Sequence, residues 1–136
     1  NNRGTSVSIA GYLLYNSNYP DSERAFVFGK DITLATMDYL LLCCNGDGVS
    51  SPAFGVGGED TITLSKDGSI VSSSGVLPGL GEFDRTYALT SRGDLVQTTT
   101  PTPGTINVIT YTPYLGGSSQ VVINEISEIS YVTFRA

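Results

Sequence analysis

The stretch Thr61–Gly68 reads TITLSKDG, and it decides the fold class more clearly than any other part of the chain. Its alternation places Ile62 and Leu64 on one face, as a half-buried antiparallel strand requires. Asp67-Gly68 follows, and this pair can supply the positive φ that a tight hairpin turn demands. The stretch therefore predicts a β-strand that ends in a hairpin.

Similar short segments recur along the chain between turn signals, which is typical of a sandwich or barrel rather than of βαβ units. The residues that alternation places on shared faces are Tyr87 with Leu89, Ile106 with Val108, and Val132 with Phe134. The run from Tyr39 to Cys44 is apolar throughout, which predicts a central strand covered on both faces. We therefore expect an all-β fold, an antiparallel β-sandwich or jelly-roll-like barrel of about nine short strands.

Turn residues predict two further hairpins. Asn45-Gly46 or Asp47-Gly48 can supply the required positive φ in the first. The second spans Ser91 to Asp94, with Gly93 in the left-handed position.

The helical signal is weak, and at most one short helix is expected. Ile123, Ile126 and Ile129 are spaced by three, which allows a short helix near 122–129. Residues 21–25 are long enough for a single turn. Neither segment is long enough to organise the fold.

The length of 136 residues fits a single domain. No apolar run approaches the roughly 20 residues needed to span a bilayer, so no membrane insertion is expected. Residues 1–6 (NNRGTS) are linker-like, and we interpret them as a hinge before a single β domain at 7–136. The chain has the character of a processed product or of a domain excised from a longer protein.

Charge is sparse and acidic. The chain has thirteen acidic and seven basic residues, for a net charge of −6. Nucleic-acid binding requires a cluster of basic residues, so we expect no direct nucleic-acid binding by this domain. If a parent protein packages nucleic acid, another segment must do so.

Catalytic chemistry has few candidates here. The sequence contains no His, which removes the usual general base and the commonest zinc ligand. Two carboxylates across a cleft can hydrolyse glycosides, but neighbouring acids in such a small domain more often lie in turns. The neighbouring pairs are Asp21 with Glu23, Asp31 with Asp38, Glu59 with Asp60, and Glu82 with Asp84. We expect no enzymatic activity.

Cofactor sites are equally sparse. Adjacent strand residues point to opposite faces, so Cys43 and Cys44 are not expected to form a disulfide; one thiol should be buried and the other should face a sheet or a neighbour. Calcium prefers clustered oxygen ligands, which Asn45–Gly48 and Gly57–Asp60 offer without completing an EF-hand. No cofactor is expected, with calcium as the open alternative.

The segment Arg92-Gly93-Asp94 is the most specific motif in the chain. A cation and an anion on opposite sides of a flexible glycine form a geometry that integrins read, yet Asp and Gly are also ordinary corner residues. Both interpretations stay open. Asp47 and Asp67, in the other predicted turns, complete the candidate receptor-binding residues.

The polar segment 1–6, the short Thr- and Tyr-rich strands, the low charge and the closing strand at 130–136 together resemble a known module. The chain is similar to the protruding domain of small icosahedral RNA-virus coat proteins, such as those of nodaviruses and tombus-like viruses. The resemblance implies a spike of two or three copies on the virion surface that attaches to a host receptor or glycan. We predict a homodimer, because pairing of copies buries exposed strand edges.

Two other functions remain as alternatives. One is a lectin-like domain or adhesin that binds a carbohydrate or receptor through loops around Asp47, Asp60 and Arg92–Asp94. The other is a phage decoration or tail-tip domain.

Overall fold

The computed structural model describes residues 1, 4–18, 25–80 and 85–109, and the backbone of residues 113–116, 122–127 and 131–135. This part of the chain is all-β and contains no helix. Nine strands have four residues or more, and three have two residues. The strands are β1 (Val7–Ser8), β2 (Leu13–Asn16), β3 (Phe26–Val27), β4 (Thr33–Leu34), β5 (Leu40–Cys43), β6 (Thr61–Lys66), β7 (Ser69–Val76), β8 (Thr86–Leu89), β9 (Asp94–Thr98), β10 (Pro113–Gly116), β11 (Val122–Ser127) and β12 (Tyr131–Arg135). The predicted fold class is confirmed.

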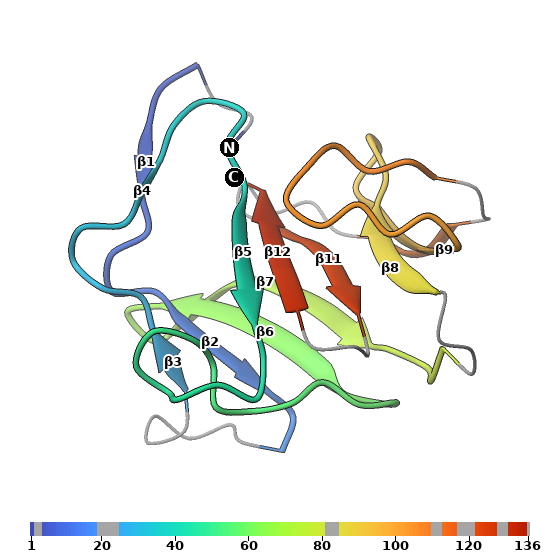
Figure 1. Ribbon diagram of the computed structural model, residues 1–136, viewed down its shortest axis with the longest axis horizontal. Helices are drawn as coiled ribbons and strands as arrows, with labels where there is room; N and C mark the ends of the chain where they lie inside the picture. Colours follow the sequence, from blue (N-terminus) through green and yellow to red (C-terminus); the bar gives the residue numbers. More distant parts are fainter. Residues whose placement is uncertain are drawn as a thin grey trace.

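Two large antiparallel sheets form the layers of a sandwich (Figure 1). One sheet has six strands in the order β10-β9-β8-β11-β12-β5, and the other has four in the order β3-β2-β6-β7. A small third sheet pairs β1 with β4. Both large sheets keep free edges, so the described strands form a sandwich rather than a closed barrel.

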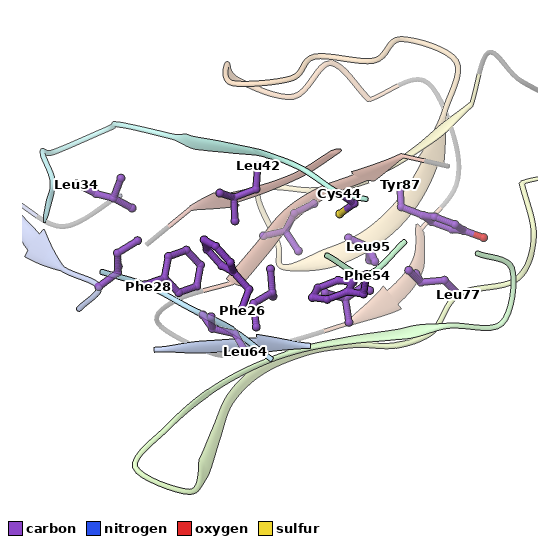
Figure 2. Close-up of a cluster of buried hydrophobic side chains, with 14 of the residues drawn as sticks. Phe26, Phe28, Leu34, Leu42, Cys44, Phe54, Leu64, Leu77, Tyr87 and Leu95 are labelled. Atoms are coloured by element: carbon purple, nitrogen blue, oxygen red, sulfur yellow. The ribbon is translucent and has the colours of Figure 1, made fainter. Parts of the chain in front are cut away.

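The core lies between the two sheets. Leu14, Ile62 and Leu64 of the four-stranded sheet are at most 2% exposed, and Leu42 and Tyr87 of the six-stranded sheet are buried as well. Side chains from both layers surround Phe26, Phe28 and Phe54 in Figure 2. The rings of Phe26 and Phe28 pack edge to face with centroids 5.2 Å apart, a favoured aromatic geometry.

The β6–β7 hairpin forms as the sequence predicts. Lys66 pairs with Ser69, so Asp67 and Gly68 are the only two turn residues. Their φ angles are 49° and 77°, and two positive φ angles match the right-handed twist of the flanking strands. Ile62 and Leu64 lie in the core, as predicted.

The position predicted for the apolar run Tyr39–Cys44 is wrong. Among the described strands, β5 lies at the edge of the six-stranded sheet and pairs only with β12. Leu42 and Cys44 face the core, whereas Leu41 is 46% exposed and Cys43 is exposed. The run is apolar on both faces although only one face is covered. The prediction of one buried thiol is confirmed by Cys44, whereas Cys43 is exposed rather than facing a sheet or a neighbour.

Two other local predictions are also wrong. Residues 122–127 form β11, which pairs with β8 and β12, because sheet hydrogen bonds outweigh the weak helical spacing of the isoleucines. Ile106 and Val108 lie in a loop, 65% and 51% exposed. Val132 and Phe134 do lie in a strand, β12.

Parts of two local predictions concern residues outside the described ranges. Residues 21–24 of the predicted single turn lie outside the described residues, as do 128 and 129 of the predicted helix. None of the described residues belongs to a helix that could cross a membrane.

Candidate functional site: the β8–β9 turn

The Arg92-Gly93-Asp94 segment forms the turn between β8 and β9. The N–H of Gly93 donates to the carbonyl of Thr90 at 3.1 Å, and the N–H of Thr90 donates to the carbonyl of Asp94 at 2.8 Å. The φ of Gly93 is 91°. This is a three-residue hairpin loop, in which a β-turn is followed by a left-handed residue. The predicted corner, with Gly93 in the left-handed position, is confirmed.

The side chain of Thr90 fixes the backbone of the turn from inside. Its Oγ1 accepts hydrogen bonds from the N–H of Arg92 at 3.2 Å and from the N–H of Asp94 at 3.1 Å. A hydroxyl that bonds nearby N–H groups stabilises a tight turn. Asp94 also pairs across the strands with Gly116 of β10, so its backbone is held by Thr90 on one side and by β10 on the other.

The two charged side chains of the turn remain available. Arg92 is exposed and Asp94 is half-buried. Among the described residues, neither side chain makes an ion pair or a side-chain hydrogen bond. The turn therefore presents a cation and an anion on a backbone that four hydrogen bonds to Thr90 hold in place.

Asn107 braces the base of this turn. Its Nδ2 donates to the carbonyl of Leu89, the residue before Thr90, at 2.9 Å. Thr98 Oγ1 donates to the carbonyl of Val108 at 3.1 Å, which ties the same loop to the end of β9. Asn107 was not among the predicted site residues, because its only signal in the sequence is a polar residue between Ile106 and Val108.

Asp47 stabilises its own loop. Its carboxylate accepts hydrogen bonds from Ser50 Oγ at 2.7 Å and from the N–H groups of Val49, Ser50 and Ser51 at 2.9, 2.8 and 3.2 Å. The Ser50 hydroxyl, followed by these N–H groups, holds the pKa of Asp47 well below its usual range. Asp47 is exposed, but its carboxylate is already engaged.

The hairpin predicted at Asn45–Gly48 does not join two neighbouring strands. Asn45 and Gly48 have positive φ as expected, 58° and 76°. After the turn the chain runs back beside Asn45 and Gly46. The N–H of Asn45 donates to the carbonyl of Phe54, and the N–H of Gly46 donates to the carbonyl of Pro52. The result is a narrow loop after β5, because β5 pairs with β12 rather than with β6.

The structure does not bring the candidate receptor-binding residues together. Asp67 is exposed at the β6–β7 turn. Figure 1 shows that turn and the loop after β5 at the left, whereas the β8–β9 turn lies at the upper right. The β8–β9 turn is therefore a site separate from Asp47 and Asp67.

Asp60, a contact residue in the lectin alternative, is buried at 6% exposure. Its carboxylate accepts hydrogen bonds from Ser17 Oγ, Asn18 Nδ2 and the N–H of Gly57. It is thus engaged within the fold. In the part of the chain that the structure describes, no three His, Cys, Asp or Glu residues are grouped to hold a metal ion. The predicted acid pairs Asp21 with Glu23 and Glu82 with Asp84 lie outside this part.

Cys44 is an unreactive core thiol. Burial, with a smaller contribution from Cys43, raises the pKa of Cys44 to about 11. Because the thiolate is the nucleophile, Cys44 is almost entirely in its inert form at neutral pH.

Comparisons of the chain with protein-family models, with curated proteins and with solved structures found no match. The resemblance to virus protruding domains therefore remains a hypothesis from the sequence pattern.

Proposed function

We propose that this domain is a receptor-binding module displayed on the surface of a larger assembly, and that Arg92, Gly93 and Asp94 form its contact site. The geometry of the β8–β9 turn supports this most directly. The turn fixes the backbone between two oppositely charged side chains that have no partner among the described residues. Receptors of the integrin class recognise this pattern.

The backbone of the turn is already ordered before a receptor binds, and this order raises the binding affinity. A flexible tripeptide loses conformational freedom on binding, whereas a turn already held by Thr90 and by β9 loses little. Arginine is also among the residues that most often dominate the energy of an interface. The turn thus suits recognition by a protein receptor that has an acidic pocket for Arg92 and a hydrogen-bond donor or a cation for the carboxylate of Asp94.

The more specific form of the proposal follows the resemblance to protruding domains. In this form the domain is a dimeric spike on the virion surface of a small icosahedral RNA virus, and it attaches the particle to a host cell. An antiparallel sandwich of low charge with a prominent charged turn fits that role.

Adhesion of cultured cells to the immobilised domain tests the contact site. Asp94→Asn and Asp67→Asn are matched variants, because each removes one negative charge from a hairpin turn without changing its shape. Loss of a dominant contact costs about 2 kcal/mol, so we expect Asp94→Asn to weaken adhesion roughly 30-fold. Asp67→Asn should leave adhesion within about twofold of wild type.

Equal adhesion of the two variants and the wild type would reject the contact site. A glycan array provides the contrasting outcome. Binding to one sugar family that Asp94→Asn does not affect would indicate a carbohydrate-binding domain instead.

A further inference from the structure

The four edges of the two large sheets are not alike. β3 has only two residues, and β10 begins at Pro113 with a register shift in its pairing to β9. The pairing of β7 with β6 contains two register shifts. Short strands, prolines and bulges are features that prevent an exposed strand edge from pairing with another chain. Three edges therefore have a protective feature.

β5 has none of these features apart from its modest length. Its four residues pair with β12 in an unbroken register, from Leu40 opposite Phe134 to Cys43 opposite Tyr131. The strand contains no charge and no proline, and Leu41 is 46% exposed. On the side away from β12, none of the described residues hydrogen-bonds to the backbone of β5.

We infer that β5 pairs with β5 of a second copy of the chain, so that two six-stranded sheets join into one. A two-fold axis perpendicular to a sheet places a strand antiparallel to its own copy, which satisfies the free backbone groups on both sides. The two copies of Leu41 and of Cys43 then gather on one face of the joined sheet. This inference rests on the proposed function, which expects two copies, and it names the surface that joins them.

Charge does not oppose contact with a second copy at this position. Each chain carries a net charge of −6, so two copies repel each other over most of their surface. Contact is least opposed where charge is absent, as along Leu40–Cys43. β11 and β12 separate β5 from β8, so this pairing leaves the β8–β9 turn accessible in both copies.

Sedimentation equilibrium of the wild type, Leu41→Lys and Ile70→Lys tests the inference. Ile70 is 68% exposed on β7, so Ile70→Lys makes the same change at an edge with protective features. Like charges opposite each other destabilise a strand pair, and we expect Leu41→Lys to raise the dimer dissociation constant at least roughly tenfold. Ile70→Lys should leave it within about twofold. An unchanged constant in Leu41→Lys, or equal weakening by Ile70→Lys, would overturn the inference.

Hydrogen exchange of the wild type at several concentrations gives a second test that needs no variant. The amides of residues 40–43 that face away from β12 should become more protected as the dimer forms, while those of β3 should not. A wild type that stays monomeric at tens of micromolar, or a dimer without added protection at 40–43, would overturn the pairing.

The two proposals fail separately. If adhesion still depends on Asp94 while β5 pairing fails, only the interface is rejected. If dimerisation depends on Leu41 while adhesion is unchanged in Asp94→Asn, only the receptor site is rejected.

Discussion

The carboxylate of Asp60 accepts a hydrogen bond from the hydroxyl of Ser17 at 2.8 Å, although 43 residues separate them in the chain. The same carboxylate accepts from Asn18 Nδ2 at 2.9 Å and from the N–H of Gly57 at 2.8 Å. These contacts tie the turn after β2 to the loop before β6. Asp60 therefore positions two neighbouring strands of the four-stranded sheet from outside their hydrogen-bond ladder.

Asp60→Ala is expected to destabilise the domain by about 1–2 kcal/mol. Hydrogen bonds to a charged group contribute about 1.5–3 kcal/mol, but Ser17, Asn18 and Gly57 are exposed and can bond to water in the variant, which lowers the cost. Urea denaturation measures this change. Asp31→Ala, which removes the same charge from an exposed turn, should stay within about 0.5 kcal/mol of wild type.

Tyr87→Phe is expected to cost about 1–1.5 kcal/mol. The buried Tyr87 hydroxyl donates to the carbonyl of Pro78 at 2.6 Å and accepts from Gln97 Nε2 at 2.9 Å, so the variant leaves two groups without their partner. Urea denaturation again reports the difference. Tyr15→Phe serves as the control, since no described residue bonds to the Tyr15 hydroxyl. A Tyr87→Phe variant as stable as the control would contradict this assignment.

Gly93→Ala is expected to cost about 1–2 kcal/mol, because the φ of 91° is unfavourable for any residue with a Cβ. Gly29→Ala is the matched control: an added Cβ there meets nothing within 4 Å, and the backbone does not require glycine. Thermal unfolding should show a clear loss in Gly93→Ala and little change or a slight gain in Gly29→Ala. Equal effects at the two positions would be inconsistent with the observed turn.

The loop held by Asp47 should weaken in acid. The hydrogen bonds from Ser50, Val49 and Ser51 lower the pKa of Asp47 in the folded state, so its contribution to stability is full above the ordinary Asp pKa of about 3.9 and is lost as the pH falls below it. The melting temperature of wild type should exceed that of Asp47→Ala at pH 7, and the gap should narrow below about pH 4. A gap that stays constant down to pH 2 would contradict the role given to Asp47.

The sequence pattern predicted the fold correctly where the preferences of neighbouring residues agree with the long-range pairing of the strands. In β6, alternation identified Ile62 and Leu64 as core residues, and Asp67-Gly68 identified the turn, because both depend on residues close in sequence. The β8–β9 corner was predictable for the same reason, since only Gly93 readily adopts the φ that this loop requires.

Long-range pairing explains the failures. Isoleucines spaced by three suggested a helix, but β11 is a strand because β8 and β12 flank it. The apolar run ending at Cys44 suggested a central strand, whereas β5 lies at an edge. No local pattern reveals which strand will be a neighbour. Pairing of β5 with a second copy would give that run the central position its sequence suggests.

The candidate site was predictable only in part. Arg92, Gly93 and Asp94 were identified from the motif, but the brace from Asn107 to Leu89 joins residues 18 apart and has no local signature. Asp47 was placed with Arg92–Asp94 among the candidate receptor-binding residues only because it is an Asp in a predicted turn. The structure gives it a different role, since its carboxylate is satisfied by its own loop.

Binding of the wild-type domain to purified integrin ectodomains on a biosensor, with and without a soluble Arg-Gly-Asp peptide, tests the central claim most directly. We expect saturable binding by at least one integrin, and the peptide should abolish it because both ligands occupy the same receptor groups. No binding across the integrin panel, or binding that the peptide leaves intact, would contradict the assignment of the β8–β9 turn as the recognition site.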